Sequence, residues 1–198
     1  MKIIFITGAS GSGKTTLSNK LSELLYNSIV LRTDNYYKIG YRSLLLSLFI
    51  KSYFDKIISL DKVLFFNDLN RIIEKKEVSH FYRYDFITKK RLKFNNKISD
   101  LKYLLIEGIF SQEILKESNL LNCLLIKLNL KKEICLKRIM ARDQKERGKN
   151  KEKSINDFHN GYFVYKQKEK EINLNKRYEE IVFTKEPDIQ KILDKLKS

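Results

Sequence analysis

The chain has 198 residues, of which 42% are hydrophobic and 32% charged, so it can fill a packed core and is expected to fold as a single domain over residues 1–198. One proline and seven glycines exclude collagen-like and low-complexity chains, and two cysteines are too few for a disulfide framework. The formal charge of +16 is compatible with a surface for nucleic acid or polyphosphate, but the interleaving of basic with acidic residues is more typical of a solvated surface.

The first predicted elements are a strand that runs into a glycine-rich turn and a helix that leaves this turn. Further short apolar runs predict buried strands, and apolar residues at helical spacing predict the helices between them. The expected strands cover residues 2–7, 28–32, 102–106, 122–128 and 181–183. The expected helices cover residues 14–26, 41–53, 61–76, 131–142 and 188–197.

Strands that alternate with helices in this way indicate an α/β fold of three layers with a doubly wound, mostly parallel sheet. Segment 80–94 is aromatic and basic, and we expect it to form a hairpin or another extended excursion from the sheet. Residues 143–153 are polar and charged and contain Gly148, so this segment can form a small lid.

We expect no export signal or membrane-spanning segment in this sequence. The apolar run at residues 3–6 is too short, because a signal peptide needs about 7–15 apolar residues and a spanning helix about 20. Residues 43–54 are also apolar, and their length and charged flanks predict a buried or groove-lining helix. We therefore expect a cytoplasmic protein with no membrane partner.

Residues 8–15 (GASGSGKT) fit the phosphate-binding pattern G-x-x-x-x-G-K-[ST] and predict the P-loop NTPase fold. The glycines let main-chain N–H groups wrap a triphosphate at the positive end of the following helix. Lys14 is expected to neutralise the β and γ phosphates, and the Thr15 hydroxyl to ligate Mg²⁺. The predicted nucleotide-binding residues are Gly8, Ala9, Ser10, Gly11, Ser12, Gly13, Lys14, Thr15 and Thr16.

Two carboxylates follow predicted strands and should therefore reach the ligand site. Ligands bind beyond the carboxyl ends of parallel strands, which places Asp34 toward the γ-phosphate and Glu107 beside Mg²⁺. A kinase needs such a base for the acceptor hydroxyl and such an acid for the metal. The alternatives are a helix cap or turn for Asp34 and an ordinary strand-end carboxylate for Glu107.

Five short blocks, in their order along the chain, resemble the uridine kinase family. They are the phosphate-binding loop, residues 34–38 (DNYYK), residues 84–86 (YDF), residues 106–109 (IEGI), and residues 142–148 with their Arg-Asp and Glu-Arg-Gly. The blocks span about residues 3 to 150, and their combination is specific although each is short. The resemblance implies phosphorylation of the 5′-hydroxyl of a pyrimidine nucleoside, uridine or cytidine, with ATP or GTP as donor and Mg²⁺.

The same resemblance assigns roles to residues around the acceptor. Asp34 corresponds to the catalytic aspartate that activates the hydroxyl, and Glu107 to the glutamate on the metal side. Tyr37 and Tyr84 correspond to tyrosines near the base, with core packing as the alternative for Tyr84. Asp55 corresponds to the aspartate that holds the ribose hydroxyls. Asp61 competes with it because the usual His-Pro-Asp after this aspartate is missing.

Three arginines complete the predicted site. Arg142 and Arg147 correspond to lid arginines that clamp the phosphates, so they join Lys14 and Asp34 in the catalytic set, and Arg138 is assigned to substrate binding. A closed lid would bring guanidinium groups to the transferred phosphoryl group and exclude water. The alternative for these arginines is a solvated helix face.

The chain departs from the family pattern at two lysines. Lys89 stands where the family has a histidine that reads the pyrimidine edge, and Lys149 replaces a lid arginine. A lysine only donates, so it cannot accept a hydrogen bond from a cytosine amino group. The pyrimidine selectivity of the family is therefore open at this position, and uridine over cytidine, or another acceptor, becomes possible. The histidines His80 and His159 are expected to have surface or packing roles.

These observations favour a pyrimidine nucleoside kinase over three alternatives. A related kinase could use another acceptor, of the nicotinamide riboside, pantothenate or phosphoribulose type. The positive charge could instead serve a nucleic-acid-associated ATPase or RNA kinase, although we expect no nucleic-acid partner. A non-catalytic NTP-binding regulator is the third alternative. The family often assembles into homo-oligomers, and the sequence leaves the oligomeric state open.

Overall fold

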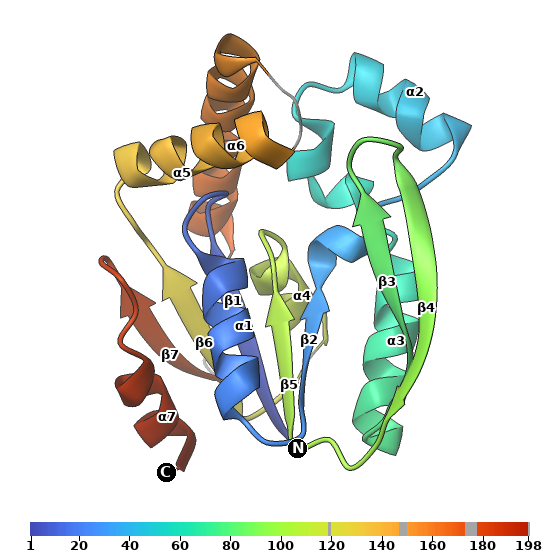
Figure 1. Cartoon of the computed structure of the whole chain (residues 1–198), viewed down its shortest axis with the longest axis vertical. Helices are drawn as coiled ribbons and strands as arrows, with labels where there is room; N and C mark the ends of the chain where they lie inside the picture. The colour runs from blue at the N-terminus through green and yellow to red at the C-terminus, as the bar shows by residue number, and fades with distance from the viewer. Residues whose placement is uncertain (119, 147–149, 173–177, 198) are drawn as a thin grey trace.

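The computed structural model describes residues 1–118, 120–146, 150–172 and 178–197. Within these ranges the main sheet has five parallel strands in the order β2-β5-β1-β6-β7, with β1 at the centre (Figure 1). The strands are β1 (Lys2–Gly8), β2 (Ser28–Arg32), β5 (Tyr103–Glu107), β6 (Cys123–Leu128) and β7 (Tyr178–Phe183). The expected strands are thus confirmed, and β7 begins earlier than expected.

Helices cover both faces of this sheet and create two separate core layers. On one face, α3 and α4 bury residues such as Phe65 and Ile114. On the other face, α1, α5 and α7 bury residues such as Leu21 and Ile192. These helices are α1 (Lys14–Leu24), α3 (Lys62–Lys75), α4 (Ser111–Ser118), α5 (Lys132–Glu146) and α7 (Ile189–Lys197). The predicted three-layer, doubly wound α/β fold is confirmed.

The aromatic and basic segment forms an antiparallel hairpin outside the main sheet. Its strands are β3 (Val78–Asp85) and β4 (Lys90–Ile98). The Asp85 carboxylate accepts hydrogen bonds from the N–H groups of Ile87 and Thr88 and so holds the turn, while Lys89 adopts a φ of 57°. In Figure 1 this turn points toward the end of the molecule where the strands of the main sheet end.

The helix expected at residues 41–53 differs in both length and burial. Helix α2 (Tyr41–Phe49) ends early, and Ser52, with a φ of 55°, turns the chain into the short helix η2 (Tyr53–Asp55). Of the two expectations, a buried or a groove-lining helix, the buried one is wrong, because Phe49 is 79% exposed. The helix faces the protein with Ser43, whose hydroxyl donates to the main-chain oxygen of Lys38 and lies 3.2 Å from the Tyr53 hydroxyl. Because Ser43 packs toward the protein through these polar contacts, the leucines of α2 lie on its exposed side.

The segment assigned to a lid is divided between two helices. Helix α5 continues to Glu146, and α6 (Lys151–Glu171) begins five residues later. Arg147, Gly148 and Lys149 lie outside the described residues. Figure 1 shows α5 and α6 at the end of the molecule where the sheet strands terminate, opposite the two chain termini. Helix α4 was not expected, because its eight residues contain only one adjacent pair of apolar side chains, Ile114 and Leu115.

Candidate active site

The phosphate-binding loop joins β1 to α1. Close packing requires a glycine at residue 11, and a left-handed backbone favours one at residue 13. Gly11 has a φ of 80°, and a Cβ atom there would lie 2.3 Å from the main-chain oxygen of Cys135. Gly13 has a φ of 96° and is the N-cap of α1. A chain of this shape without side chains can present its N–H groups to phosphate oxygens. The nine predicted nucleotide-binding residues all lie in this loop and the first turn of α1.

Lys14 is buried at the start of α1, beside two carboxylates. Its ammonium group donates to the main-chain oxygens of Gly8 at 2.9 Å and Ala9 at 3.1 Å. Burial lowers the pKa of Lys14, and the carboxylates of Glu107 and Asp34 oppose this shift. Burial likewise raises the pKa of Glu107, and Lys14 opposes that shift. The structure thus brings Lys14, Glu107 and Asp34 within electrostatic reach of one another, as the strand ends predicted.

Asp34 lies in the short helix η1 (Thr33–Tyr36) that follows β2, and it caps neither this turn nor α2. The Thr33 hydroxyl donates to its carboxylate at 3.5 Å. A Cβ atom on Gly108 would lie only 1.8 Å from the hydroxyl oxygen of Thr33. Gly108 directly follows Glu107, and Thr33 directly precedes Asp34. This close approach therefore keeps the main chain at Glu107 near the main chain at Asp34.

Thr15 and Glu107 form a pair of oxygen donors that suits Mg²⁺. The Thr15 hydroxyl donates to Oε1 of Glu107 at 3.1 Å. In the part of the chain that is described, no group of three or more His, Cys, Asp or Glu residues could hold a metal ion alone. Mg²⁺ keeps several waters and commonly binds through one or two protein oxygens together with nucleotide phosphates. The pair therefore fits a Mg²⁺ ion that arrives with the nucleotide.

Four aromatic rings pack together in what we call the aromatic cluster. They come from the residue directly after η1, from η2 and from the hairpin: Tyr37, Phe54, Tyr84 and Phe86. The ring centroids lie 5.2 Å apart for Tyr37 and Phe54 and 5.3 Å apart for Tyr37 and Tyr84. Nζ of Lys89 lies 4.8 Å from the centre of the Phe54 ring. Burial raises the pKa of Tyr84 to about 12, so its hydroxyl stays protonated at neutral pH. Tyr84 is 4% exposed, so it packs in the core as well as contributing to the cluster.

The two aspartates that compete for the ribose differ in their surroundings. Oδ1 of Asp61 accepts a hydrogen bond from the N–H of Leu64 and so caps α3, and its other oxygen pairs with Arg91 at 3.2 Å. Asp55 lies in η2 against α6, where a Cβ atom on Gly161 would be 2.7 Å from its Oδ1. Asp61 therefore has a structural role, and Asp55 remains the candidate for the acceptor.

The predicted arginines that the structure describes, Arg138 and Arg142, have different partners. Both Nε and Nη2 of Arg142 donate to the Asp143 carboxylate, and Arg142 is close enough to Lys14 to lower its pKa further. Arg138 donates to the main-chain oxygen of Ser12 at 3.4 Å and pairs with Glu186. Arg138 thus contacts the phosphate-binding loop instead of the aromatic cluster. Arg147 lies outside the described residues.

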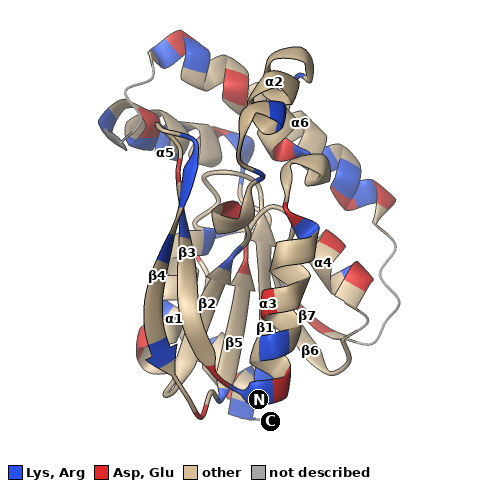
Figure 2. Ribbon diagram, turned by 90° about the vertical axis from the view of Figure 1, so that its right-hand side faces the viewer, with Lys and Arg blue, Asp and Glu red and all other residues tan. Residues whose placement is uncertain are grey.

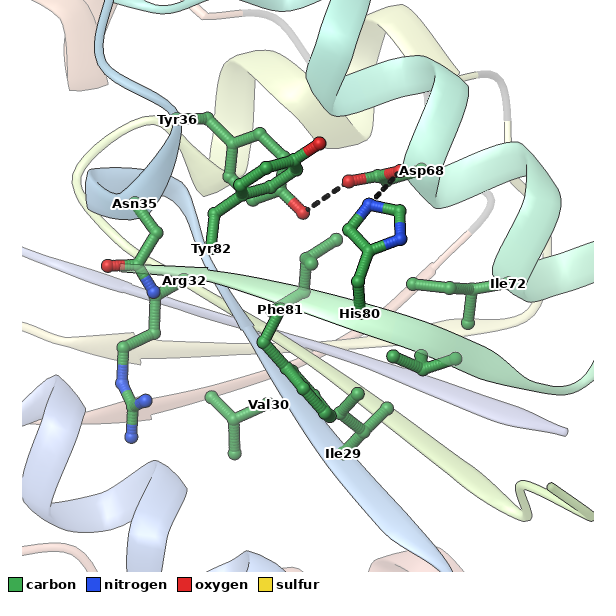
Figure 3. A pocket seen from close by; sticks show the side chains of 12 residues that line it. Ile29, Val30, Arg32, Asn35, Tyr36, Asp68, Ile72, His80, Phe81 and Tyr82 are labelled. Atoms are coloured by element: carbon green, nitrogen blue, oxygen red, sulfur yellow. Dashed lines mark hydrogen bonds and ion pairs between the residues drawn. The ribbon is translucent and has the colours of Figure 1, made fainter. Parts of the chain in front are cut away.

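Sequence reasoning missed a buried polar group behind Asp34. Asp68 on α3 accepts a hydrogen bond from the Tyr36 hydroxyl at 2.9 Å, and Nε2 of His80 lies 3.5 Å from its other oxygen (Figure 3). The adjoining cavity has a volume of about 20 Å³, which is room for a water molecule and not for a substrate. The sequence position of Asp68 could have indicated its burial. Asp68 follows Phe65 by three residues and precedes Ile72 by four, which is the spacing of the buried face of the helix. The expected packing role of His80 is confirmed.

Acidic pH is expected to destabilise the protein through His80. Burial lowers the pKa of this histidine. The carboxylate of Asp68 acts to raise this pKa, and the positive charges of Arg71 and Lys93 act to lower it. The titratable or polar groups that face it are Asp68, Arg71, Lys93, Tyr82 and Ser79. The unfolded chain takes up the proton near the ordinary pKa of 6.5, whereas the folded chain resists it. Stability that is present above this pH is therefore lost as the pH falls below it. Between about pH 7.5 and 5.5 the melting temperature of His80→Gln should fall less than that of the wild type. Equal slopes would contradict this account.

The surface charge is mixed. Figure 2 shows Lys and Arg alternating with Asp and Glu along helices such as α6, as expected for a solvated surface. Among the described residues, no helix has the length and apolar character needed to cross a bilayer.

Comparisons with known proteins identify the family. The model of the family described as "Phosphoribulokinase / Uridine kinase family" matches residues 3–190. A uridine kinase of Borrelia turicatae is 35% identical over 162 residues, which are 80% of this chain and 75% of that protein. A uridine kinase of Staphylococcus epidermidis is 29% identical over 161 residues, 80% of this chain and 76% of that protein.

Solved structures share the fold at lower sequence identity. A putative fructose transport system kinase from Silicibacter has a TM-score of 0.61 at 16% identity and covers 92% of this chain and 89% of its own. A possible uridine kinase from Bacillus stearothermophilus has a TM-score of 0.57 at 18% identity and covers 90% of this chain and 88% of its own. From the extent of the family match and the identity to its relatives, the chain belongs to the phosphoribulokinase and uridine kinase family and is a P-loop kinase that carries out ATP-dependent phosphoryl transfer.

Proposed function

We propose that this kinase transfers the γ-phosphoryl group of ATP to the 5′-hydroxyl of a pyrimidine nucleoside, with uridine preferred, in a cytoplasmic salvage reaction. The observation that carries the proposal is a hydrogen bond of 3.2 Å from the N–H of Tyr84 to the side-chain oxygen of Asn35. It ties the turn of Asp34 to the aromatic cluster. A base, a metal-side pair and a set of rings thus meet where the parallel strands end.

In the proposed reaction, Asp34 accepts the proton of the acceptor hydroxyl while the hydroxyl oxygen attacks the γ-phosphorus. The bond from this phosphorus to the β–γ bridging oxygen breaks, and ADP leaves. Lys14 and Arg142, together with Arg147, would stabilise the charge on the transferred group. Mg²⁺, held by Thr15 and Glu107 with the nucleotide, would screen the phosphates.

The aromatic cluster and its two polar neighbours would hold the nucleoside. Tyr37 and Tyr84 are each 4% exposed, so they would shape the base pocket from behind the partly exposed rings of Phe54 and Phe86. The Asp55 carboxylate can accept hydrogen bonds from both ribose hydroxyls. Lys89 can donate to a uracil carbonyl but has nothing to accept a hydrogen bond from a cytosine amino group. Uridine is therefore proposed as the better acceptor.

The proposal is tested by ADP release from Mg-ATP with a panel of acceptors: uridine, cytidine, nicotinamide riboside, pantothenate, ribulose 5-phosphate and RNA. We expect kcat/KM for uridine to exceed that for cytidine by about tenfold or more, because a donor left facing an amino group costs roughly 1–3 kcal/mol. Lys89→Gln, which both donates and accepts, should reduce this ratio. Turnover with RNA alone, or with another acceptor alone, would refute the assignment to pyrimidine nucleosides.

A methyl group added at Gly161 should weaken acceptor binding. It would lie 2.7 Å from Oδ1 of Asp55, so either α6 or Asp55 must move. In Gly161→Ala we expect the KM for uridine to rise about tenfold, because small displacements of a binding group have large effects, while the KM for ATP stays within about twofold. Asn156→Ala, an exposed substitution in the same helix, serves as the control. A parallel rise of both KM values in Gly161→Ala would mean that the fold, and not the acceptor site, is disturbed.

A further inference from the structure

Asp68 is a buried carboxylate that no step of the proposed reaction uses. It is 5% exposed, and its two oxygens lie 2.9 Å from the Tyr36 hydroxyl and 2.8 Å from Nη2 of Arg71. Figure 3 shows its side chain directed from α3 toward Tyr36 and His80. A buried carboxylate is retained only where its partners compensate for lost hydration. These contacts make Asp68 the polar side chain through which α3 holds the Tyr36 hydroxyl of the turn η1.

Tyr36 is the last residue of the turn that carries Asp34. It is 3% exposed, and its ring packs edge-on against Phe65 at 5.0 Å and Tyr82 at 5.5 Å. Burial and the charge of Asp68 hold the pKa of Tyr36 above its ordinary value, so its hydroxyl remains a donor. The hydrogen bond to Asp68 therefore fixes the position of Tyr36 two residues beyond Asp34.

The other residues of η1 are held from different directions. The side chain of Asn35 bonds the N–H of Tyr84 in β3, and Thr33 is confined by Gly108 after β5. The main-chain oxygen of Tyr36 accepts a hydrogen bond from the N–H of Asp61, the N-cap of α3, at 2.8 Å. The bond to Asp68 adds a side-chain attachment to α3. Without it, the carboxyl end of the turn keeps the main-chain bond but loses the polar anchor of the Tyr36 side chain.

We propose that Asp68 is a positioning residue for phosphoryl transfer: through the Tyr36 hydroxyl it fixes the turn that aims the Asp34 carboxylate at the acceptor hydroxyl. The inference rests on the proposed function of Asp34. A general base acts only within hydrogen-bond reach of its proton, so the rate depends on how well the supporting contacts hold it.

Three variants separate the hydrogen bond from the charge. Tyr36→Phe and Asp68→Leu remove the bond, whereas Asp68→Asn keeps an oxygen that can accept it. We expect kcat with uridine to fall about tenfold in the first two and to stay within about threefold in Asp68→Asn, consistent with the worth of one buried hydrogen bond. The KM for ATP should stay within about twofold in all three. The double variant Tyr36→Phe/Asp68→Leu should be no slower than the slower single variant.

The decisive measurement repeats Tyr36→Phe in the Asp34→Asn background. If Tyr36 acts by positioning Asp34, it should cause no further loss of kcat there, whereas a general structural defect would lower kcat equally in both backgrounds. Hydrogen exchange of peptides that cover residues 33–37 supplies a readout without any acceptor. Exchange there should quicken about tenfold in Tyr36→Phe, while peptides within residues 65–73 of α3 stay unchanged.

These readouts distinguish the two proposals. A wild type that phosphorylates no nucleoside would refute the proposed function, and the exchange at residues 33–37 would still decide whether Asp68 anchors the turn. Unchanged exchange in Tyr36→Phe, or an equal loss of kcat in the two backgrounds, would overturn the positioning role.

Discussion

Asp34→Asn is expected to lower kcat with uridine by about a thousandfold, because an amide cannot accept the proton of the acceptor hydroxyl and general-base catalysis contributes roughly 10²–10⁴. The substitution keeps the size and shape of the side chain in η1. ATP binding should persist, since the phosphate-binding loop and Lys14 are unchanged. Steady-state rates of ADP release and calorimetric titration with ATP would measure the two effects separately.

A suitable control is Asp100→Asn, at an exposed residue where the main chain has a φ of 57°, a conformation that asparagine also favours. Its kcat should stay within about twofold of the wild type, because the residue lies at the other end of β5 from Glu107. A kcat for Asp34→Asn close to that of the wild type would show that another group deprotonates the acceptor, and the proposed mechanism would be abandoned.

The parts of the site that depend on strand ends could be predicted from the sequence. Asp34 and Glu107 each follow an apolar strand, and parallel strands deliver such residues to one edge of the sheet. The phosphate-binding loop is likewise a local feature, because its glycines and Lys14 lie within a few residues of one another. The predicted hairpin supplied Tyr84 and Lys89 for the same reason.

The contacts between distant segments could not be predicted in this way. The bond from Tyr36 to Asp68 depends on how α3 packs beside η1, and the approach of Gly161 to Asp55 depends on where α6 crosses η2. The expected burial of α2, which comes from the length of its apolar stretch and its charged flanks, is also wrong. Ser43, through its hydrogen bond to the main chain of Lys38, selects the opposite face of that helix. Packing geometry, and not composition, decides each of these contacts.

Lys14→Met is expected to lower kcat/KM for ATP by about a thousandfold, since one preorganised charge at the transferred group contributes roughly 10²–10³ in rate and nucleotide affinity also falls. Methionine has a similar length but no charge. Lys14→Arg should restore little activity, although it restores the charge. The main-chain oxygens of Gly8 and Ala9 accept from the compact ammonium group of Lys14 at 2.9 and 3.1 Å, and a larger planar guanidinium cannot reproduce this arrangement from the same position.

The control for Lys14 lies on the same helix. Lys20 is exposed on α1, so Lys20→Met should keep kcat/KM for ATP within about twofold of the wild type. Activity of Lys14→Arg near that of the wild type would mean that positive charge alone suffices. The close fit of the ammonium group in the loop would then have no catalytic consequence. A large loss in both Lys14→Met and Lys20→Met, with Lys14→Arg active, would instead trace the effect to the general charge of α1. The expected pattern, with both Lys14 variants impaired and Lys20→Met intact, follows from burial, because only Lys14 is enclosed by the loop that would receive the phosphates.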